Sequence, residues 1–166
     1  DVEISKNGNR FVVGEKSFGF ADGRVRVYEY NGSSLVQVGQ SLIEGGDVNF
    51  FGTEVAINDN GTRIATVASV GPTGGGETKV YELNGNTWQQ IGNTLNGEGQ
   101  GGVTEVDFNG SGQRMAIGNF TGFSRGVCRV YDFVNGIWEQ VGTDFVGDEE
   151  NDSLAASIDL SQSGDI

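Results

Sequence analysis

The chain has 166 residues, 29 of them glycine, with no histidine and a formal net charge of −13. This length suits one domain with a core of its own, and the glycine content predicts many turns between short elements. The charge argues against nucleic acid or an anionic membrane surface as a partner, because both need clustered Lys and Arg. No apolar run approaches the about 18 residues of a transmembrane helix, so no membrane insertion is expected.

A repeat of about 50 residues runs through the whole chain. Glycines at one repeat position are 53, 51 and 52 residues apart: Gly8, Gly61, Gly112 and Gly164. We therefore divide the chain into repeats at about 1–53, 54–104 and 105–156, with a partial fourth repeat at 157–166.

Each repeat carries four strand signals in the same order. The first is a short stretch of alternating apolar residues, such as 2–4, followed by a polar turn. The second begins at an arginine, as in 10–14, and a glycine-rich loop leads to a third strand with a Val-Tyr pair. The third and fourth strands form a hairpin, as in KVYELNGNTWQQIG at 79–92, where Asn-Gly suits a tight turn. No segment has a sustained 3.6-residue apolar period, so we expect no helix.

Four antiparallel strands per repeat predict an all-β fold, a β-propeller segment of three four-stranded blades plus the first strand of a fourth. A β-sandwich is the alternative, but it does not explain why equivalent positions recur in every repeat. Closed propellers usually have about four to eight blades. We therefore expect a segment of a longer polypeptide, with closure of a ring by several copies as the alternative.

Two motifs carry a resemblance to a known family: VRVYEYNGSSLVQVG at 25–39 and VAINDNGTRIA at 55–65. They resemble tandem-repeat proteins of diatoms, related algae and marine bacteria, which are distantly similar to the FG-GAP repeats of integrin α chains. The resemblance implies a secreted or cell-surface β-propeller that serves in adhesion or recognition. The acidic residue that the family places before the turn glycine is Asn or Ser here, at Asn7, Asn60, Ser111 and Ser163.

From the residues and the resemblance together we expect a non-catalytic structural or protein-interaction module, outside the cell or on its surface, and no enzyme. Its partners would be other protein subunits or the rest of its own chain. The alternatives are a carbohydrate-binding, lectin-like propeller and a glycoside-active enzyme. Catalysis lacks the usual groups, because a chain without histidine has no Ser-His-Asp or Cys-His arrangement. Cys128 lies among apolar strand residues, where a thiol is usually a small buried hydrophobe.

The loops between strands hold the candidate ligand-binding residues, because loops vary on a constant scaffold. Aromatic rings there could stack on sugars or anchor a protein; packing between blades is the other interpretation. The candidates are Phe18, Phe20, Phe50, Phe51, Phe120, Phe123 and Arg125.

One repeat position holds acidic residues just before the first strand: Asp1, Glu54 and Glu105. If that strand lines a central channel, these carboxylates would ring one mouth of it and suit a hard cation such as Ca²⁺. A solvated rim paired with strand arginines is the other interpretation, and Ser157 replaces the acid in the fourth repeat. Beyond this Ca²⁺ candidate, we expect no cofactor.

Six basic residues occupy two repeat positions, which indicates a structural role such as pairing with carboxylates. They are Arg10, Arg63, Arg114, Arg26, Lys79 and Arg129. Five Asn-x-Ser/Thr sequons are candidate glycosylation sites in a secreted protein. Their asparagines are Asn31, Asn60, Asn109, Asn119 and Asn151.

Overall fold

The chain folds into three four-stranded antiparallel sheets, each made of four consecutive strands. The computed structural model describes residues 1–19, 22–44, 50–69, 75–97, 105–119, 125–150 and 152–164. The first sheet contains β1 (Val2–Ile4), β2 (Arg10–Gly14), β3 (Val25–Tyr30) and β4 (Leu35–Leu42). The second contains β5 (Phe51–Ile57), β6 (Arg63–Ala68), β7 (Glu77–Asn84) and β8 (Thr87–Asn96). The third contains β9 (Glu105–Phe108), β10 (Arg114–Asn119), β11 (Val127–Val134) and β12 (Ile137–Val146).

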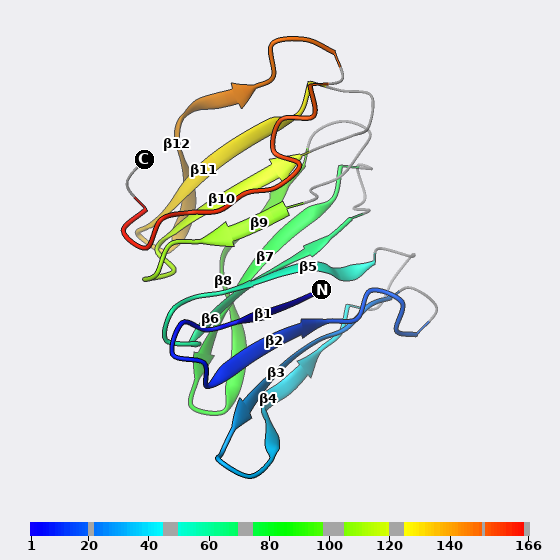
Figure 1. Cartoon of the computed structure of the whole chain (residues 1–166), viewed down its shortest axis with the longest axis vertical. Helices are drawn as coiled ribbons and strands as arrows, with labels where there is room; N and C mark the ends of the chain where they lie inside the picture. The colour runs from blue at the N-terminus through cyan, green and yellow to red at the C-terminus, as the bar shows by residue number, and fades with distance from the viewer. Residues whose placement is uncertain are drawn as a thin grey trace.

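The three sheets stack face to face in chain order along the long axis of the molecule (Figure 1). The first strands β1, β5 and β9 are neighbours, and so are the last strands β4, β8 and β12. The predicted all-β class with three four-stranded antiparallel sheets is therefore confirmed. A two-sheet sandwich is excluded, because the repeats form three separate sheets. Within the described ranges no helix occurs that is long and apolar enough to cross a membrane.

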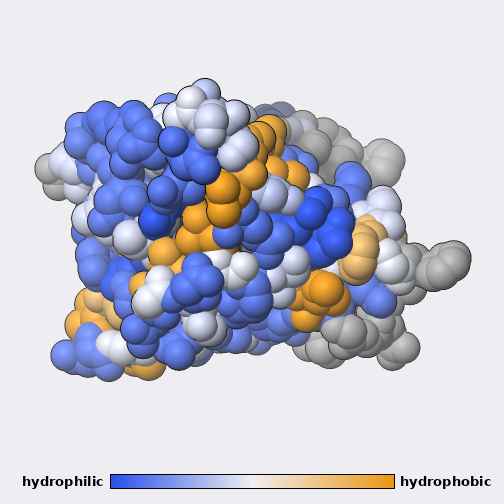
Figure 2. Space-filling model, turned by 90° about the horizontal axis from the view of Figure 1, so that it is seen from below, coloured by the Kyte–Doolittle hydropathy of each residue, from blue (hydrophilic) through white to orange (hydrophobic). Residues whose placement is uncertain are grey.

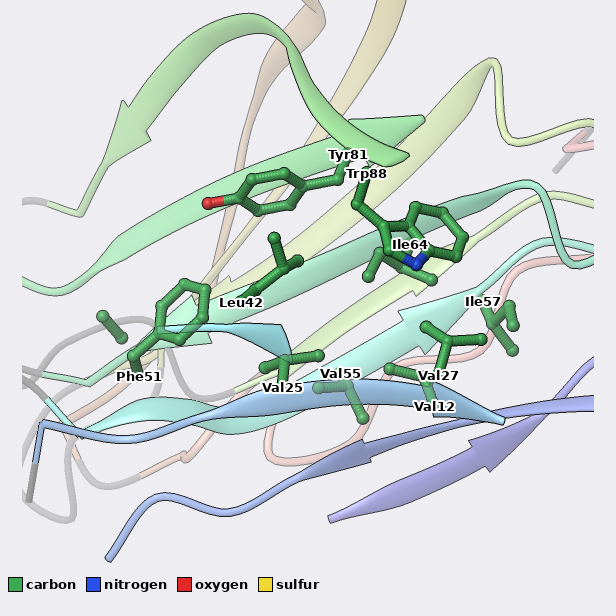
Figure 3. Close-up of a cluster of buried hydrophobic side chains, with 11 residues drawn as sticks. Val12, Val25, Val27, Leu42, Phe51, Val55, Ile57, Ile64, Tyr81 and Trp88 are labelled. Atoms are coloured by element: carbon green, nitrogen blue, oxygen red, sulfur yellow. The ribbon is translucent and has the colours of Figure 1, made fainter. Parts of the chain in front are cut away.

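The middle sheet is covered on both faces, and β6 is buried at every position. Successive strand residues point to opposite faces. Ile64 and Ala68 accordingly pack with Val25, Leu42 and other residues toward the first sheet (Figure 3), whereas Ala65 and Val67 pack toward the third. Two separate apolar layers therefore hold the three sheets together.

A glycine in the last strand of each sheet marks a register shift against the preceding strand. Gly39, Gly92 and Gly142 have φ of +72°, +70° and +72°, a backbone conformation that costs glycine little and marks a bulge of the glycine type. The glycine recurrence in the sequence thus reflects a bend built into each sheet.

The predicted first strand of a fourth repeat is wrong, because residues 152–164 form no strand. The segment nevertheless lies along the third sheet (Figure 1), and the Gly110 N–H donates to the Gln162 carbonyl at 2.9 Å. A strand is defined by its ladder to a partner strand, and no second strand of a fourth repeat lies beside this segment in the described residues.

Candidate functional site

Carboxylates line the free edges of the first strands. Each of β1, β5 and β9 lies at the edge of its sheet and pairs on one side only. Residues i and i+2 of a strand share a face, so two repeat positions place acids together there. The first position holds Asp1, Glu54 and Glu105. The second holds Glu3, Asp107 and Asp159, with Ala56 in the second repeat.

Three of these carboxylates, Asp1, Glu3 and Asp107, accept hydrogen bonds from the backbone of the next repeat. The N–H of Val55 donates to Asp1 at 3.1 Å, and the N–H of Ile57 donates to Glu3 at 2.5 Å. The N–H of Leu160 donates to Asp107 at 2.5 Å in the same way. An edge strand leaves such N–H groups without a ladder partner, so one repeat caps the exposed edge of the next.

Glu3 has the most unusual titration among these acids. Burial raises the pKa of its carboxyl from 4.5 to about 7. The hydrogen bond from Ile57 opposes the rise, whereas the negative charges of Asp107 and Asp159 add to it. A carboxyl that titrates near neutral pH can both give and take a proton under physiological conditions, as acid–base catalysis requires.

The neighbouring acids are shifted in the same direction. Burial raises the pKa of Glu54, and the charge of Glu105 raises it further. Burial also raises the pKa of Glu105 and of Asp107, and Asp159 adds to the latter. The carboxylates thus influence one another across the repeats, as closely spaced acids do.

The sequence predicted the acids of the first repeat position, but not those of the second. Asp1, Glu54 and Glu105 were predicted, and the structure places Glu54 and Glu105 close enough to interact electrostatically. Glu3 and Asp107 were not singled out. A signal for them exists in the sequence, because each is a lone acid between two apolar residues of a first strand.

The predicted Ca²⁺ site has no assembled ligand set in the described ranges. No group of three or more acidic or cysteine side chains there is arranged to hold a metal ion. Ca²⁺ takes about six to eight oxygen ligands. The carboxylates of Asp1, Glu3 and Asp107 are already engaged with backbone N–H groups.

The candidate loop aromatics divide into buried, paired and undescribed residues. Phe51 is only 1 % exposed and belongs to the core between the first two sheets, so it offers no surface to a ligand. Phe18 is 38 % exposed, and the Arg24 guanidinium lies 3.9 Å from its ring centre. Phe50 is half-buried and Arg125 is exposed. Phe20, Phe120 and Phe123 lie outside the described residues.

The repeated basic residues join neighbouring strands and neighbouring sheets. Arg63 pairs with Glu82 on the adjacent strand at 2.7 Å and donates to the Gly112 carbonyl of the next repeat at 3.0 Å. Arg10 and Arg114 make the equivalent bonds to Gly61 and Gly164. The second set forms ion pairs on the sheet surface: Arg26 with Glu15, Lys79 with Glu44 and Glu77, and Arg129 with Asp144. The predicted structural role agrees with these contacts.

The sequon asparagines differ in accessibility. Asn31 and Asn60 are exposed and Asn119 is half-buried, whereas Asn151 lies outside the described residues. Asn109 is 7 % exposed, and its side-chain oxygen accepts from the N–H groups of Gln113 and Arg114. A glycan attached to the Asn109 Nδ2 would have to displace Ser163, whose carbonyl accepts from this nitrogen at 3.4 Å. Cys128 is half-buried, and burial raises the pKa of its thiol, as expected for an unreactive cysteine.

Comparison with solved structures shows which known proteins share this arrangement. One is described as a “putative 6-phosphogluconolactonase” from Bacteroides fragilis, with a TM-score of 0.65 and 11 % identity over 90 % of this chain. Another with the same description, from Bacteroides uniformis, has a TM-score of 0.63 and 15 % identity over 90 % of this chain. The chain spans only 39 % and 40 % of those two structures.

Searches against family models and curated proteins gave no match. The resemblance to surface-protein repeats therefore stays a prediction, as does the extracellular location.

The structural comparison corrects our functional expectation. We expected a non-catalytic structural or interaction module and no enzyme, whereas the two solved structures named above are described as enzymes. This prediction is wrong, and the enzymatic alternative fits the neighbours better. Similarity at 11 and 15 % identity establishes the arrangement of strands, and an activity for this chain has to rest on its own residues.

Proposed function

We propose that the three sheets are consecutive blades of a β-propeller. Propellers place four-stranded sheets radially around a central channel. The face-to-face stacking of the sheets in chain order and the proximity of β1, β5 and β9 support this arrangement. So does the overlap of 90 % of the chain with two larger structures. The first strands would then line the channel.

We further propose that this propeller is a hydrolase of a carbohydrate-type substrate, with the first-strand carboxylates as its acid–base groups. Glu3 carries the proposal: its carboxyl is half-buried, lies near Asp107 and Asp159, and has a pKa raised to about 7. Strongly shifted acids in such surroundings are typical of catalytic sites.

We propose a sugar lactone as the substrate, because the two solved neighbours are described as putative lactonases. The carboxylate of Glu3 would take a proton from a water molecule as the water oxygen attacks the lactone carbonyl carbon. The ring C–O bond then breaks, and the Glu3 carboxyl gives the proton that it has just taken to the leaving oxygen. The product is the open-chain hydroxy acid. Hydrolysis of a glycosidic bond would need a second acid beside Glu3, because two carboxyl groups are the usual requirement.

The charge of the site favours a neutral substrate. The description of the solved neighbours names a phosphorylated sugar lactone for them. In this chain the acids of both repeat positions lie in or next to the neighbouring first strands, and the net charge is −13. A phosphate would be repelled there. We therefore propose a lactone or glycoside without a phosphate group.

Hydrolysis assays with the native protein and one matched pair of variants test this proposal. Glucono-δ-lactone, its 6-phosphate and nitrophenyl glycosides are offered at equal concentrations, with buffer alone as the blank. We expect turnover of a neutral substrate that falls about 100-fold or more in Glu3→Gln, because general acid–base catalysis contributes 10²–10⁴-fold. Glu139→Gln, an exposed acid on β12, should leave turnover unchanged. Equal loss in both variants, or no turnover by the native protein, refutes the assignment.

A further inference from the structure

Neighbouring sheets are joined at their outer strands by a tryptophan that packs on a glycine. Trp88 of β8 lies against Gly39 of β4, so that a Cβ on this glycine would come within 2.6 Å of the indole. The indole N–H donates to the Val38 carbonyl at 2.9 Å. The Gln40 side chain donates to the Trp88 carbonyl and accepts from the Trp88 backbone N–H. Trp88 is 3 % exposed.

The second junction repeats the first. Trp138 of β12 lies on Gly92 of β8, again with 2.6 Å between the indole and a Cβ built on the glycine. Its backbone N–H donates to Asn93, the residue that follows the glycine, as Gln40 follows Gly39. The Trp138 indole N–H, unlike that of Trp88, has no hydrogen-bond acceptor among the described residues. The contact between tryptophan and glycine is common to both junctions and defines what an occupied outer strand looks like in this fold.

The third sheet has the equivalent glycine, Gly142, but no tryptophan lies against it in the described residues. A Cβ built on Gly142 meets no atom within 4 Å. Phe145 stands three residues after this glycine, where the first sheet has Leu42; Leu42 is 9 % exposed, whereas Phe145 is 51 % exposed. Val141 is also exposed, at 38 %. Figure 2, which views the molecule from below, shows an apolar stripe at the opposite end of the stack.

An open hollow elsewhere on the third sheet marks a second unfilled position. It has a volume of about 300 Å³ and is lined by Arg114, Asp132, Phe133 and neighbouring residues. At the preceding junction the equivalent arginine, Arg63, is covered by the Phe133 ring at 5.0 Å, and its side chain is 10 % exposed against 28 % for Arg114. A side chain of a following sheet would fill the cavity as Phe133 covers Arg63.

Residues 152–164 already occupy the inner half of this junction. Arg114 donates to the Gly164 carbonyl at 2.8 Å, as Arg63 does to Gly112 at 3.0 Å. Asp107 accepts from Leu160, as Glu3 accepts from Ile57. The established interface between sheets therefore continues onto this segment.

We propose that the exposed face of the third sheet, formed by Val141, Gly142 and Phe145, is the docking site for a further four-stranded sheet that residues 157–164 begin. The outer hairpin of that sheet would bring a tryptophan onto Gly142. A second copy of the chain is a poor occupant for two reasons. Its β1 would compete for the place that residues 158–160 already hold, and it carries Leu35 at the tryptophan position.

An extended chain tests the proposal. Residues 113–146 of the chain are joined after Gly164, which is equivalent to Gly112, so that the added sheet brings a tryptophan equivalent to Trp138. We expect amide exchange in β12 to slow about tenfold or more relative to the chain of 166 residues, because covered strands open less often. Replacing the added tryptophan by leucine should remove most of this protection. An extension that leaves the exchange of β12 unchanged, folded or not, overturns the proposal.

Gly142→Ala supplies a second readout. It should lower the urea midpoint of the extended chain more than that of the original chain, because the indole is present only in the former. Gly85→Ala is the matched control, since Gly85 also has a positive φ and no atom within 4 Å of an added Cβ; it should act equally in both chains. Equal effects of Gly142→Ala in both chains contradict the docking geometry. Light scattering that shows a dimer of the original chain, dissociated by Gly142→Ala, identifies a second copy as the occupant and overturns the proposal.

Discussion

The Glu3 carboxyl should make the stability of this protein fall as the pH rises toward neutrality. In the native state its pKa is raised from 4.5 to about 7, mainly by burial. Between these two values the folded chain holds a proton that the unfolded chain has lost. Stability therefore decreases with pH in this window. The contribution is fully present below pH 4.5, is lost as the pH passes 7, and changes no further above it.

The size of the effect follows from the shift. A rise from 4.5 to about 7 corresponds to about 3 kcal/mol for a fully buried group at 1.36 kcal/mol per pKa unit. Glu3 is only half-buried, so solvent screens part of this energy and we expect about 1.5 kcal/mol. Glu3→Gln keeps an acceptor for the Ile57 N–H but cannot ionise. The variant should match the wild type at pH 4 and exceed its stability by about 1.5 kcal/mol at pH 8.

Urea unfolding of both proteins, followed by tryptophan fluorescence between pH 4 and pH 8, measures this difference. Glu139→Gln is the control, because its side chain lies exposed on β12. The other first-strand acids titrate in both proteins, so only the difference between wild type and variant reports on Glu3. If the variant and the wild type lose stability in parallel over the whole range, the buried-carboxyl argument is refuted. The same result would also contradict the assignment of Glu3 as the acid–base group.

Three further changes test the junctions between sheets by urea unfolding. Trp88→Leu should cost about 2–3 kcal/mol, because a buried ring and its hydrogen bond are lost; a loss below 0.5 kcal/mol would show that the junction contributes little. Gly92→Ala should cost about 2 kcal/mol more than Gly85→Ala, since both strain a positive φ but only the former meets an indole at 2.6 Å; equal losses would exclude the close contact. Arg63→Gln should cost about 2–3 kcal/mol and Arg10→Gln less, because the Arg63 side chain is 10 % exposed and that of Arg10 is 23 % exposed; the reverse order would contradict the burial argument.

The sequence predicted part of the candidate site. The repeat period placed Asp1, Glu54 and Glu105 at one position, and they do lie at the first-strand edges. The hydrogen bond that Asp1 accepts could not be predicted, because its donor, the Val55 N–H, belongs to the next repeat. Glu3 escaped attention because a single acid in a short apolar stretch has no unusual pattern of its own. Its raised pKa arises only when burial brings it near Asp107 and Asp159.

For the loop aromatics, the sequence predicted a ligand-binding residue that the structure buries. Phe50 and Phe51 are adjacent and chemically identical, yet Phe51 is 1 % exposed and Phe50 is half-buried. Phe51 begins β5 and points into the core between the first two sheets. Which side of the backbone faces the core depends on where the strand begins, and a composition-based argument about loops does not contain that information.

The sequence by itself determined the all-β class, the three four-stranded units and the hairpin turns. These follow from local features: the alternation of apolar residues, the Asn-Gly turns and a period of about 50 residues. The tertiary structure decided what the recurring residues do. The bulge glycines Gly39 and Gly92 receive the indoles of Trp88 and Trp138, whereas Gly142 has no occupant. Burial and the charges of neighbouring acids likewise raised the pKa of Glu3 to about 7. Each of these depends on contacts between repeats, because a side chain acquires its environment only when the next sheet is packed against it.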